Sequence, residues 1–119
     1  MESKERRKFM RIEADLEAEY WAKGPSMGTG SVRVRDFSRE GLGVLFPKPV
    51  KRGEHVDLTV KVPGDNVPIF ATAEVTWTDP SDPKETGAGL RFVAIKPLDL
   101  ARLLDCVYSR WLGGLRGKV

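Results

Sequence analysis

Six short apolar segments, separated by turn-forming residues at regular intervals, constrain the fold of this chain more than any other feature. The intervening stretches are rich in Gly, Pro, Asp and Ser. The segments cover residues 15–21, 31–36, 41–46, 55–62, 69–77 and 87–95. Six short strands without helical crossovers favour a small closed barrel, because closure removes exposed strand edges. The sequence therefore predicts an all-β fold, a six-stranded antiparallel β-barrel.

Alternation of apolar and polar residues within several of these segments predicts which side chains face the barrel interior. A period of two with one apolar face is typical of half-buried strands. The residues assigned to the interior in this way are Leu16, Ala18, Tyr20, Val56, Leu58, Val60, Val62, Ile69, Ala71, Ala73, Val75 and Trp77. The aromatic residues are expected to lie mostly in the core.

The last part of the chain changes from a strand period to a helix period. From Pro97 onward one helical stripe is apolar, and Pro97 suits a first helical turn whereas Gly113–Gly114 is a stop signal. The stripe consists of Leu100, Leu104, Val107 and Trp111, reinforced by Leu103 and Cys106. One amphipathic C-terminal α-helix is predicted. We expect a flexible N-terminal arm over 1–14, the barrel and helix over 15–112, and a tail over 113–119.

The charge of the chain is concentrated near its start. Its 119 residues suit one domain, and the formal net charge of +3 is a weak basis for a nucleic-acid-binding function. However, five of the eight residues from Lys4 to Arg11 are Lys or Arg. Such a local basic segment indicates a phosphate-bearing partner.

The compartment is predicted from the single cysteine and from the character of the first residues. Cys106 has no second cysteine with which to form an intramolecular disulfide, which favours a reducing compartment. The first eleven residues are highly charged and contain no apolar signal core, and no window is long and apolar enough for a membrane span. We expect a cytoplasmic protein with no membrane partner.

No arrangement of residues in the sequence supports catalysis. His55 is the only histidine, opens a predicted strand, and belongs to no cluster with metal-ligand spacing. Ser38 lacks the preceding glycine of a nucleophile elbow and has no evident base. We therefore predict that the protein is not an enzyme and has neither a metal nor a cofactor.

Two stretches are candidates for a binding site, ERRKFMR at 5–11 and DFSREGLG at 36–43. Each has an ordinary explanation when taken alone. The first could be a solvated basic tail. The second could be a turn in which Asp36 or Ser38 caps backbone N–H groups and Gly41 adopts a positive φ.

Taken together, the two stretches have the chemistry of a guanine-nucleotide site. An arginine fork binds phosphate oxygens or the O6 and N7 acceptors of guanine, and its flat face stacks on a base. The carboxylate of Asp36 complements the N1–H and amino donors on the other guanine edge, and Ser38 adds a small polar group. The missing side chains at Gly41 and Gly43 allow a ring to approach the backbone.

These motifs resemble those of the PilZ domain, a bacterial receptor module for cyclic di-GMP. Arg7 and Arg11 match its Arg-x-x-x-Arg motif, and residues 36–41 match its Asp/Asn-x-Ser-x-x-Gly motif. The stretch GAGLRF at 87–92 is similar to the last barrel strand of the family. The resemblance implies a barrel that binds cyclic di-GMP on its outer surface, with the arginines closing over the ligand from the N-terminal segment.

From the chemistry and the resemblance together we assign a role to each candidate residue. Arg7 and Arg11 would hold guanine edges and phosphates, and Asp36 would take a guanine Watson–Crick edge. Ser38 and Gly41 would shape the seat, and Gly43 would let the ligand approach the backbone. Arg6 would be an additional clamp, which leaves open whether one or two ligand molecules bind per chain.

The sequence is therefore interpreted as a single-domain cyclic di-GMP receptor that passes the signal to a protein partner. Two alternatives stay open. One is a small basic β-barrel that binds nucleic acid through its N-terminal arm, although the broad basic track and stacking platforms of such modules are not evident. The other is a PilZ-like protein-interaction scaffold that binds no nucleotide. The pathway, the partner and the oligomeric state are not predicted.

Overall fold

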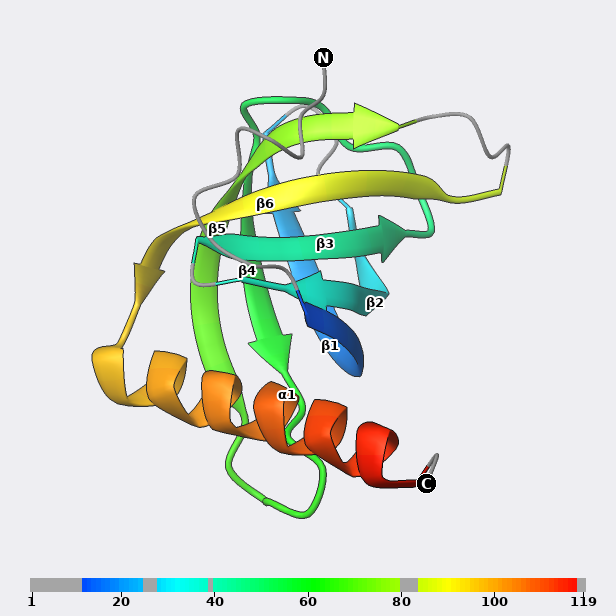
Figure 1. Cartoon of the computed structure of the whole chain (residues 1–119). Coiled ribbons are helices and arrows are strands. Elements are labelled where there is room, and N and C mark those ends of the chain that lie inside the picture. The colour runs from blue at the N-terminus through cyan, green and yellow to red at the C-terminus, as the bar shows by residue number, and fades with distance from the viewer. Residues whose placement is uncertain (1–11, 25–27, 39, 80–83, 118–119) are drawn as a thin grey trace.

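The computed structural model describes residues 12–24, 28–38, 40–79 and 84–117, with side chains to residue 109 and at 112. In these ranges the chain forms a closed antiparallel barrel followed by one helix (Figure 1). Its elements are β1 (Ile12–Lys23), β2 (Thr29–Phe37), β3 (Gly41–Phe46), β4 (His55–Val60), β5 (Ile69–Asp79), β6 (Thr86–Ile95) and α1 (Pro97–Gly117). The predicted fold class is confirmed.

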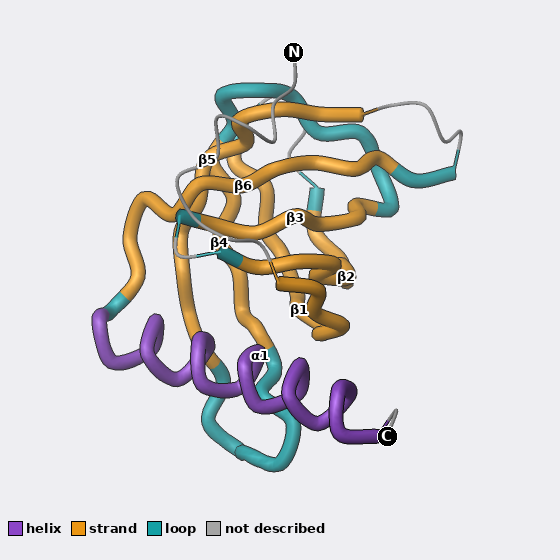
Figure 2. The backbone as a smooth tube through the Cα atoms, viewed as in Figure 1, coloured by secondary structure: helices purple, strands orange, loops and turns teal. Residues whose placement is uncertain are grey.

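The strands follow the order β1-β2-β3-β6-β5-β4 around the barrel, and β4 pairs with β1 to close it. Hairpins join β1 to β2, β2 to β3, β4 to β5 and β5 to β6, whereas β3 pairs with β6 across a long sequence separation. The tube view in Figure 2 shows β2, β3 and β6 side by side on one wall. This wall carries the second predicted motif.

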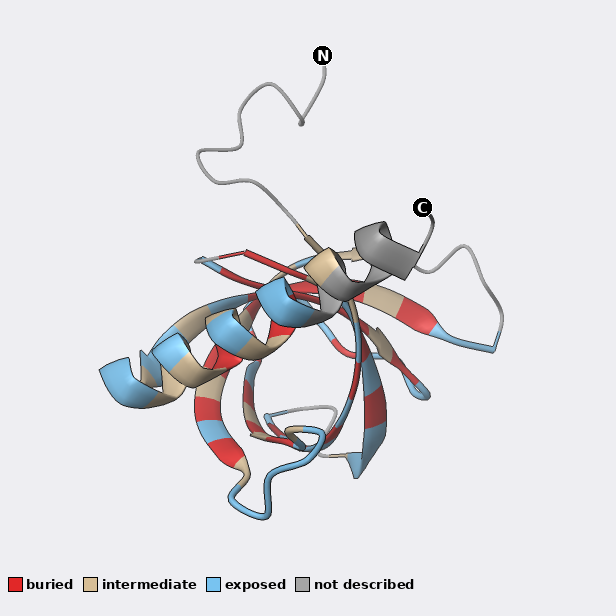
Figure 3. Ribbon diagram, turned by 60° about the horizontal axis from the view of Figure 1, so that its bottom comes forward, coloured by how far each residue is buried: buried red, intermediate tan, exposed pale blue. Residues whose placement is uncertain are grey.

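Alternate strand residues fill the barrel interior, as the period of two predicted. Figure 3 shows buried positions repeating along the strands around the barrel. Of the twelve residues assigned to the interior, ten are buried and Val62 is partly buried. Trp77 is the exception, with 44 % of its surface exposed.

Two register shifts explain why strict alternation fails near the end of β2 and near the end of β5. In β2 the pairing with β3 shifts between Val34 and Asp36, so that the extra residue Arg35 interrupts the alternation. Phe37 consequently points into the core, where its ring contacts that of Phe92, and Asp36 is left on the outer face. Such bulges re-aim the side chains that follow them.

The bulge in β5 has the same effect on Trp77. The pairing of β5 with β6 shifts between Val75 and Trp77. Val75 is buried in the interior, and without the shift Trp77 would follow it there. The sequence prediction for Trp77 was wrong because a one-residue irregularity moves every later side chain to the opposite face.

The helix α1 lies across one end of the barrel and contacts β1 and β5 (Figure 1). Leu103 and Val107 form its fully buried centre, with Leu100, Leu104 and Cys106 partly buried beside them. The side chain of Trp111 lies outside the described residues. Arg102 joins the helix to the β4–β5 loop, because its guanidinium donates hydrogen bonds to the Asp65 carboxylate and the Val67 carbonyl. No helix in the part of the chain that the structure describes is long and apolar enough to cross a membrane.

The element ends differ from the predicted ones at both termini. The helix continues through the predicted stop at Gly113–Gly114 and ends at Gly117, since a glycine inside a helix costs only about 1 kcal/mol relative to alanine. At the other end, β1 begins at Ile12, inside the segment 1–14 that was predicted as an arm. Residues 12–14 therefore belong to the barrel.

Candidate functional site

The two predicted motifs differ in what the structure shows of them. Arg6, Arg7 and Arg11 precede Ile12 and lie outside the described residues. The second motif is described except for residue 39, and it forms the end of β2, a tight turn and the start of β3. The described part of the candidate site therefore consists of this second motif and the neighbouring strands β5 and β6.

Ser38 closes the turn between β2 and β3. Its N–H donates to the Gly41 carbonyl at 2.9 Å, and the Gly41 N–H donates back to the Ser38 carbonyl at 3.2 Å. The Ser38 hydroxyl oxygen accepts a hydrogen bond from the Glu40 N–H at 3.3 Å. Ser38 is only 4 % exposed, and its hydroxyl caps the turn as the ordinary turn explanation of this stretch predicted.

Close packing against β6, and not a turn conformation, requires glycine at position 41. Gly41 is not among the glycines with positive φ, so that part of the turn explanation was wrong. A Cβ atom at position 41 would lie 1.7 Å from the Leu90 carbonyl oxygen on β6. The Glu40 carbonyl also accepts a hydrogen bond from the Phe92 N–H, which fixes the turn against β6. Close packing of two backbones therefore requires glycine here.

Gly43 makes room for the carboxylate of Asp36. The two residues are register partners on β3 and β2, and both lie on the outer side of the barrel. A Cβ atom on Gly43 would lie 2.6 Å from each carboxylate oxygen of Asp36. The carboxylate thus rests over the bare backbone of its neighbour strand. The structure brings together the four described motif residues, Asp36, Ser38, Gly41 and Gly43.

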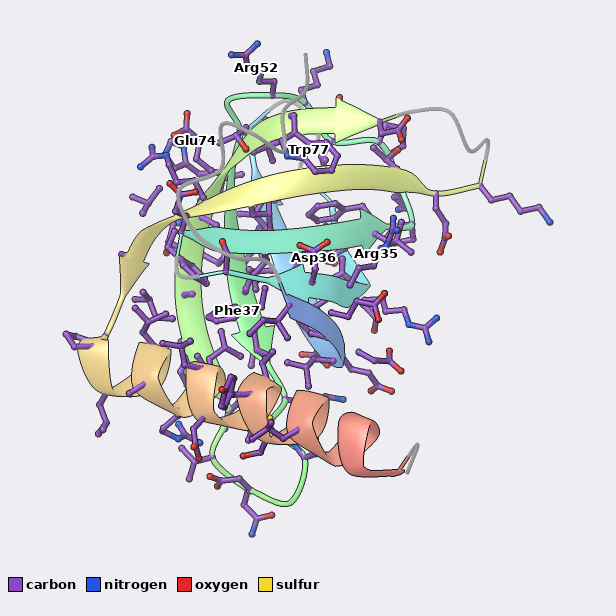
Figure 4. All side chains as sticks on the ribbon, viewed as in Figure 1. Arg35, Asp36, Phe37, Arg52, Glu74 and Trp77 are labelled. Atoms are coloured by element: carbon purple, nitrogen blue, oxygen red, sulfur yellow. The ribbon has the colours of Figure 1, made fainter. Side chains whose placement is uncertain are left out.

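The register of the sheet extends this arrangement across two further strands. Gly43 pairs with Gly89 on β6, and Gly89 pairs with Trp77 on β5. We call Asp36, Gly43, Gly89 and Trp77 the outer row. Figure 4 shows the Asp36 and Trp77 side chains on the same face of the barrel, with β3 and β6 between their strands. The row has a carboxylate at one end, an indole at the other and two glycines between them.

An arginine lies beside the outer row, on the side of the Ser38–Gly41 turn. Arg91 is the register partner of Gly41 on β3 and of Glu74 on β5. Its guanidinium forms an ion pair with the Glu74 carboxylate, and its side chain is more than half exposed. The pair places a cation close to the motif and holds it with a carboxylate on the adjacent strand.

The described residues hold no group that suggests catalysis or metal binding. No cluster of three or more potential metal ligands is found among them. His55 is exposed at the start of β4, as its position after a turn predicted. The two described carboxyl groups with lowered pKa values, Asp57 and Asp65, lie on β4 and in the β4–β5 loop rather than in the outer row.

Sequence reasoning missed Trp77 and Gly89 as members of this surface. Trp77 was assigned to the core, and Gly89 was noted only within the GAGLRF stretch. A signal was present, because a glycine inside a strand pattern often marks the close approach of another group. What the sequence could not show is which group approaches, since the Trp77 pairing depends on the bulge in β5.

A comparison with protein-family models finds one match. The model described as PilZ domain matches residues 5–109, which include both motifs. A comparison with curated proteins finds no match.

Solved structures share this fold at low sequence identity. The PilZ domain with c-di-GMP of YcgR from Escherichia coli has a TM-score of 0.70 and 20% identity, covering 95% of this chain and 96% of that one. The Bacillus subtilis inhibitor of motility (MotI/DgrA) also has a TM-score of 0.70 and 20% identity, covering 90% of this chain and 52% of that one. The K. pneumonia MrkH–c-di-GMP complex has a TM-score of 0.67 and 12% identity, covering 93% of this chain and 54% of that one. This chain thus spans about half the length of MotI/DgrA and of MrkH.

Proposed function

Because the chain belongs to the PilZ domain family, we propose that it is a bacterial receptor for cyclic di-GMP. PilZ domains are receptor modules and not enzymes. The proposal assigns the ligand to the outer wall formed by β2, β3 and β6, with the motif residues 36–43 beneath it.

The seat of the Asp36 carboxylate over Gly43 is the observation that carries this proposal. A Cβ atom on Gly43 would collide with both carboxylate oxygens of Asp36. The absence of a side chain at position 43 therefore leaves room for this carboxylate on the outer surface of the sheet. A carboxylate accepts two parallel hydrogen bonds, and guanine presents two adjacent donors at N1 and at its amino group. Such a charge-assisted pair contributes about 1.5–3 kcal/mol per hydrogen bond when it is shielded from water.

The arginine motif is the second part of the proposal. Ile12, the first described residue of β1, pairs with Phe37, and Glu13 pairs with Asp36. The chain therefore enters the barrel beside Asp36 directly after Arg11 in the sequence. We propose that Arg7 and Arg11 bind phosphates and guanine edges over the Asp36 seat, with Arg6 as an additional clamp.

Two of the structural neighbours support the choice of ligand. The structures of the YcgR PilZ domain and of MrkH are complexes with c-di-GMP. At identities of 20% and 12% these likenesses show a shared fold, so the same ligand is a proposal for this chain that a direct binding measurement must test.

The described barrel gives less support to the nucleic-acid alternative. Four of its cations each form an ion pair with a carboxylate: Lys23 on β1, Arg33 on β2, Arg91 on β6 and Lys61 directly after β4. Cations neutralised in this way do not form the continuous basic track on which nucleic-acid binding depends. The proposal further includes a cytoplasmic location, which the single cysteine favours, and a protein partner that receives the signal.

Isothermal calorimetry with cyclic di-GMP, GTP and single-stranded DNA tests the proposal. We expect cyclic di-GMP to bind near the micromolar level, about −8 kcal/mol, and the other two to bind far more weakly. Asp36→Ala should weaken binding, whereas Asp105→Ala, which removes an exposed carboxylate on α1, should not. Tighter binding of DNA would favour the nucleic-acid alternative, and no binding of any ligand would favour the scaffold alternative.

A further inference from the structure

Two exposed aromatic side chains lie on the side of the barrel away from the ligand wall. Trp21 on β1 is 60 % exposed, and Phe70 on β5 is 61 % exposed. In the closed order β1-β2-β3-β6-β5-β4, the strand between β1 and β5 is β4, which lies three strands from β3 in either direction. Figure 1 shows β3 in front and β4 behind it. The aromatic pair therefore belongs to a different surface from the wall formed by β2, β3 and β6.

Two rows of register partners cross β1, β4 and β5 on their outer side, and we call these six residues the aromatic face. They are Trp21, Asp57 and Thr72 in one row, and Glu19, Thr59 and Phe70 in the next. The strand residues between the two rows are buried in the core. Two strand spacings and two residues separate Trp21 from Phe70, or roughly 12 Å between their Cα atoms. One segment of a partner can therefore contact both rings.

The shape of this surface also suits a partner. Single exposed apolar residues are common and need no explanation. Here, however, an open hollow lies beside Phe70, and its lining includes Asp57, Thr59 and Thr72 of the aromatic face. Aromatic side chains are enriched at the centres of protein interfaces, where they contribute much of the binding energy. The aromatic face therefore offers both anchors and a depression for a bound segment.

The charge that is left unpaired on the aromatic face is negative. The Asp57 carboxylate pairs with Lys23 at 3.0 Å and also accepts a hydrogen bond from the Thr72 hydroxyl. Glu19 forms no ion pair with any residue that the structure describes. It lies two residues from Trp21 along β1 and in the same row as Phe70. A cation is therefore attracted to the space between the two aromatic rings.

The far rim of the hollow carries the opposite charge. Lys96, directly after β6, lines the hollow and forms no ion pair within the described part of the chain. A bound cation is thus favoured on the β1 side, beside Glu19, and disfavoured on the β6 side. A partner segment consequently has a preferred orientation.

We propose that the aromatic face docks a segment of a partner protein that carries an arginine or lysine between apolar side chains. Its cation pairs with Glu19 and lies against the Trp21 ring, and its apolar side chains cover Phe70 and fill the hollow. This inference rests on the protein partner included in the proposed function and specifies the chemistry of that partner. Because the aromatic face lies opposite the ligand wall, the partner and cyclic di-GMP can be bound at the same time.

The test starts from a displayed library of random peptides that is selected on wild type. The selected peptides should share an arginine or lysine flanked by apolar residues. A synthetic copy of one such peptide is then titrated into each variant by calorimetry. Trp21→Ala and Phe70→Ala should each weaken peptide binding at least about 10-fold, as for aromatic residues at the centre of an interface. Glu19→Gln should weaken it about 2- to 5-fold, the range of an exposed ion pair.

Matched controls separate the aromatic face from general surface effects. Tyr108→Ala removes an exposed aromatic ring on α1, and Asp105→Asn removes an exposed carboxylate there. Neither these changes nor Lys96→Gln should weaken peptide binding. Replacing the cation of the peptide by glutamine should weaken binding to Glu19→Gln less than binding to wild type, because both changes remove the same ion pair. Circular dichroism establishes that each variant is folded.

Several outcomes would overturn the inference. They are selection of no peptide, selection of peptides without a cation, and peptide binding that is unchanged in Trp21→Ala and Phe70→Ala. A larger loss in Lys96→Gln than in Glu19→Gln would overturn the assigned orientation. Analytical ultracentrifugation tests the other occupant, because self-association of wild type that Trp21→Ala abolishes would show that a second copy of the chain covers the face.

The receptor function is measured separately on the same variants. Trp21→Ala and Glu19→Gln should bind cyclic di-GMP as wild type does, because both residues lie outside the ligand wall. If wild type binds the peptide through the aromatic face but does not bind cyclic di-GMP, only the receptor proposal fails. If wild type binds cyclic di-GMP and the peptide results fail as above, only the docking inference is overturned.

Discussion

Asp36 and Gly43 face each other across β2 and β3 so closely that any side chain on Gly43 would occupy the place of the Asp36 carboxylate. The contact depends on the bulge at Arg35, which turns Asp36 outward and Phe37 inward. A hypothetical Cβ atom on Gly43 lies 2.6 Å from both carboxylate oxygens, a separation that real contacts do not show. The Asp36 carboxylate can thus take this position only because Gly43 has no side chain.

Gly43→Ala should therefore impair binding without direct removal of a polar group. The added methyl group displaces the Asp36 carboxylate, and we expect cyclic di-GMP affinity to fall at least about 10-fold, as for the loss of a charge-assisted hydrogen bond. Calorimetry measures the affinity. Gly87→Ala is the control, because its methyl group has ordinary van der Waals space. Wild-type affinity in Gly43→Ala would show that the Asp36 seat is not part of the site.

Gly41→Ala should act on stability instead. Its methyl group would lie 1.7 Å from the Leu90 carbonyl oxygen, so that β3 and β6 must move apart. Such overpacking costs about 1–3 kcal/mol. Differential scanning calorimetry of the ligand-free protein should show a thermal midpoint lower by at least several degrees, on the order of 4 °C for each kcal/mol. An unchanged midpoint would mean that the β3–β6 contact is looser than described.

Arg11→Ala and Asp36→Ala should separate binding from folding. Arg11 precedes the first described strand residue, and we expect Arg11→Ala to abolish measurable binding while leaving the thermal midpoint almost unchanged. Asp36→Ala should weaken binding and also cost about 1 kcal/mol of stability, if the carboxylate helps to cap the turn. The two variants are compared by calorimetric titration and thermal unfolding. Normal binding by Arg11→Ala would identify the basic segment as a solvated tail.

The number of bound ligands should depend on Arg6. The sequence contains three arginines within six residues, and one cyclic di-GMP can engage Arg7 and Arg11. A third arginine has a use if two ligand molecules stack and require a second layer of phosphate pairing. We expect calorimetry to give two ligands per chain for wild type and one for Arg6→Ala. One ligand in both proteins would rule out the stacked pair.

Acid should weaken the attachment of α1 to the barrel through Asp65. The Asp65 carboxylate accepts hydrogen bonds from the Val67 N–H and from Arg102, and these lower the pKa of Asp65. A carboxyl group whose folded pKa is lowered stabilises the fold above its unfolded pKa, about 3.9, and this contribution disappears as the pH falls through the folded pKa. Asp57 follows the same rule: burial raises its pKa, but hydrogen bonds from Lys23 and Thr72 bring it below the usual value.

The thermal midpoint of wild type should therefore fall as the pH drops below about 4. Asp65→Asn should have a lower midpoint than wild type at pH 7, and this difference should vanish at strongly acidic pH. Asp105→Asn, on the exposed side of α1, serves as the control. An equal difference between Asp65→Asn and wild type at every pH would show that the ion pair with Arg102 does not stabilise the helix.

The barrel could be predicted because its pattern is local and repeated. Alternation over β4 and over most of β5 assigned the interior correctly, as Val56, Leu58 and Val75 show. The helix began where Pro97 indicated, but its end could not be predicted from two glycines. Packing against the barrel can outweigh their modest propensity cost.

The candidate site could be proposed from the sequence only as a set of residues, and its geometry could not be predicted. The bulges at Arg35 and before Trp77 are single-residue irregularities that a period of two cannot reveal. The true constraint on Gly41 comes from Leu90, which is distant in sequence and becomes a neighbour only when β3 pairs with β6. Trp77 was missed for the same reason. The roles of Arg6, Arg7 and Arg11 remain predictions, because these residues lie outside the described part of the chain.

The most direct test of the account is a titration of the ¹⁵N-labelled protein with cyclic di-GMP, followed by amide chemical shifts. The account predicts that the largest changes occur at Asp36, Ser38, Gly43 and Gly89, on the wall formed by β2, β3 and β6. The amide of Thr59 on β4 should change little. Shifts that centre on β4 would place the ligand elsewhere, and a spectrum that does not change with excess cyclic di-GMP would contradict the receptor function itself.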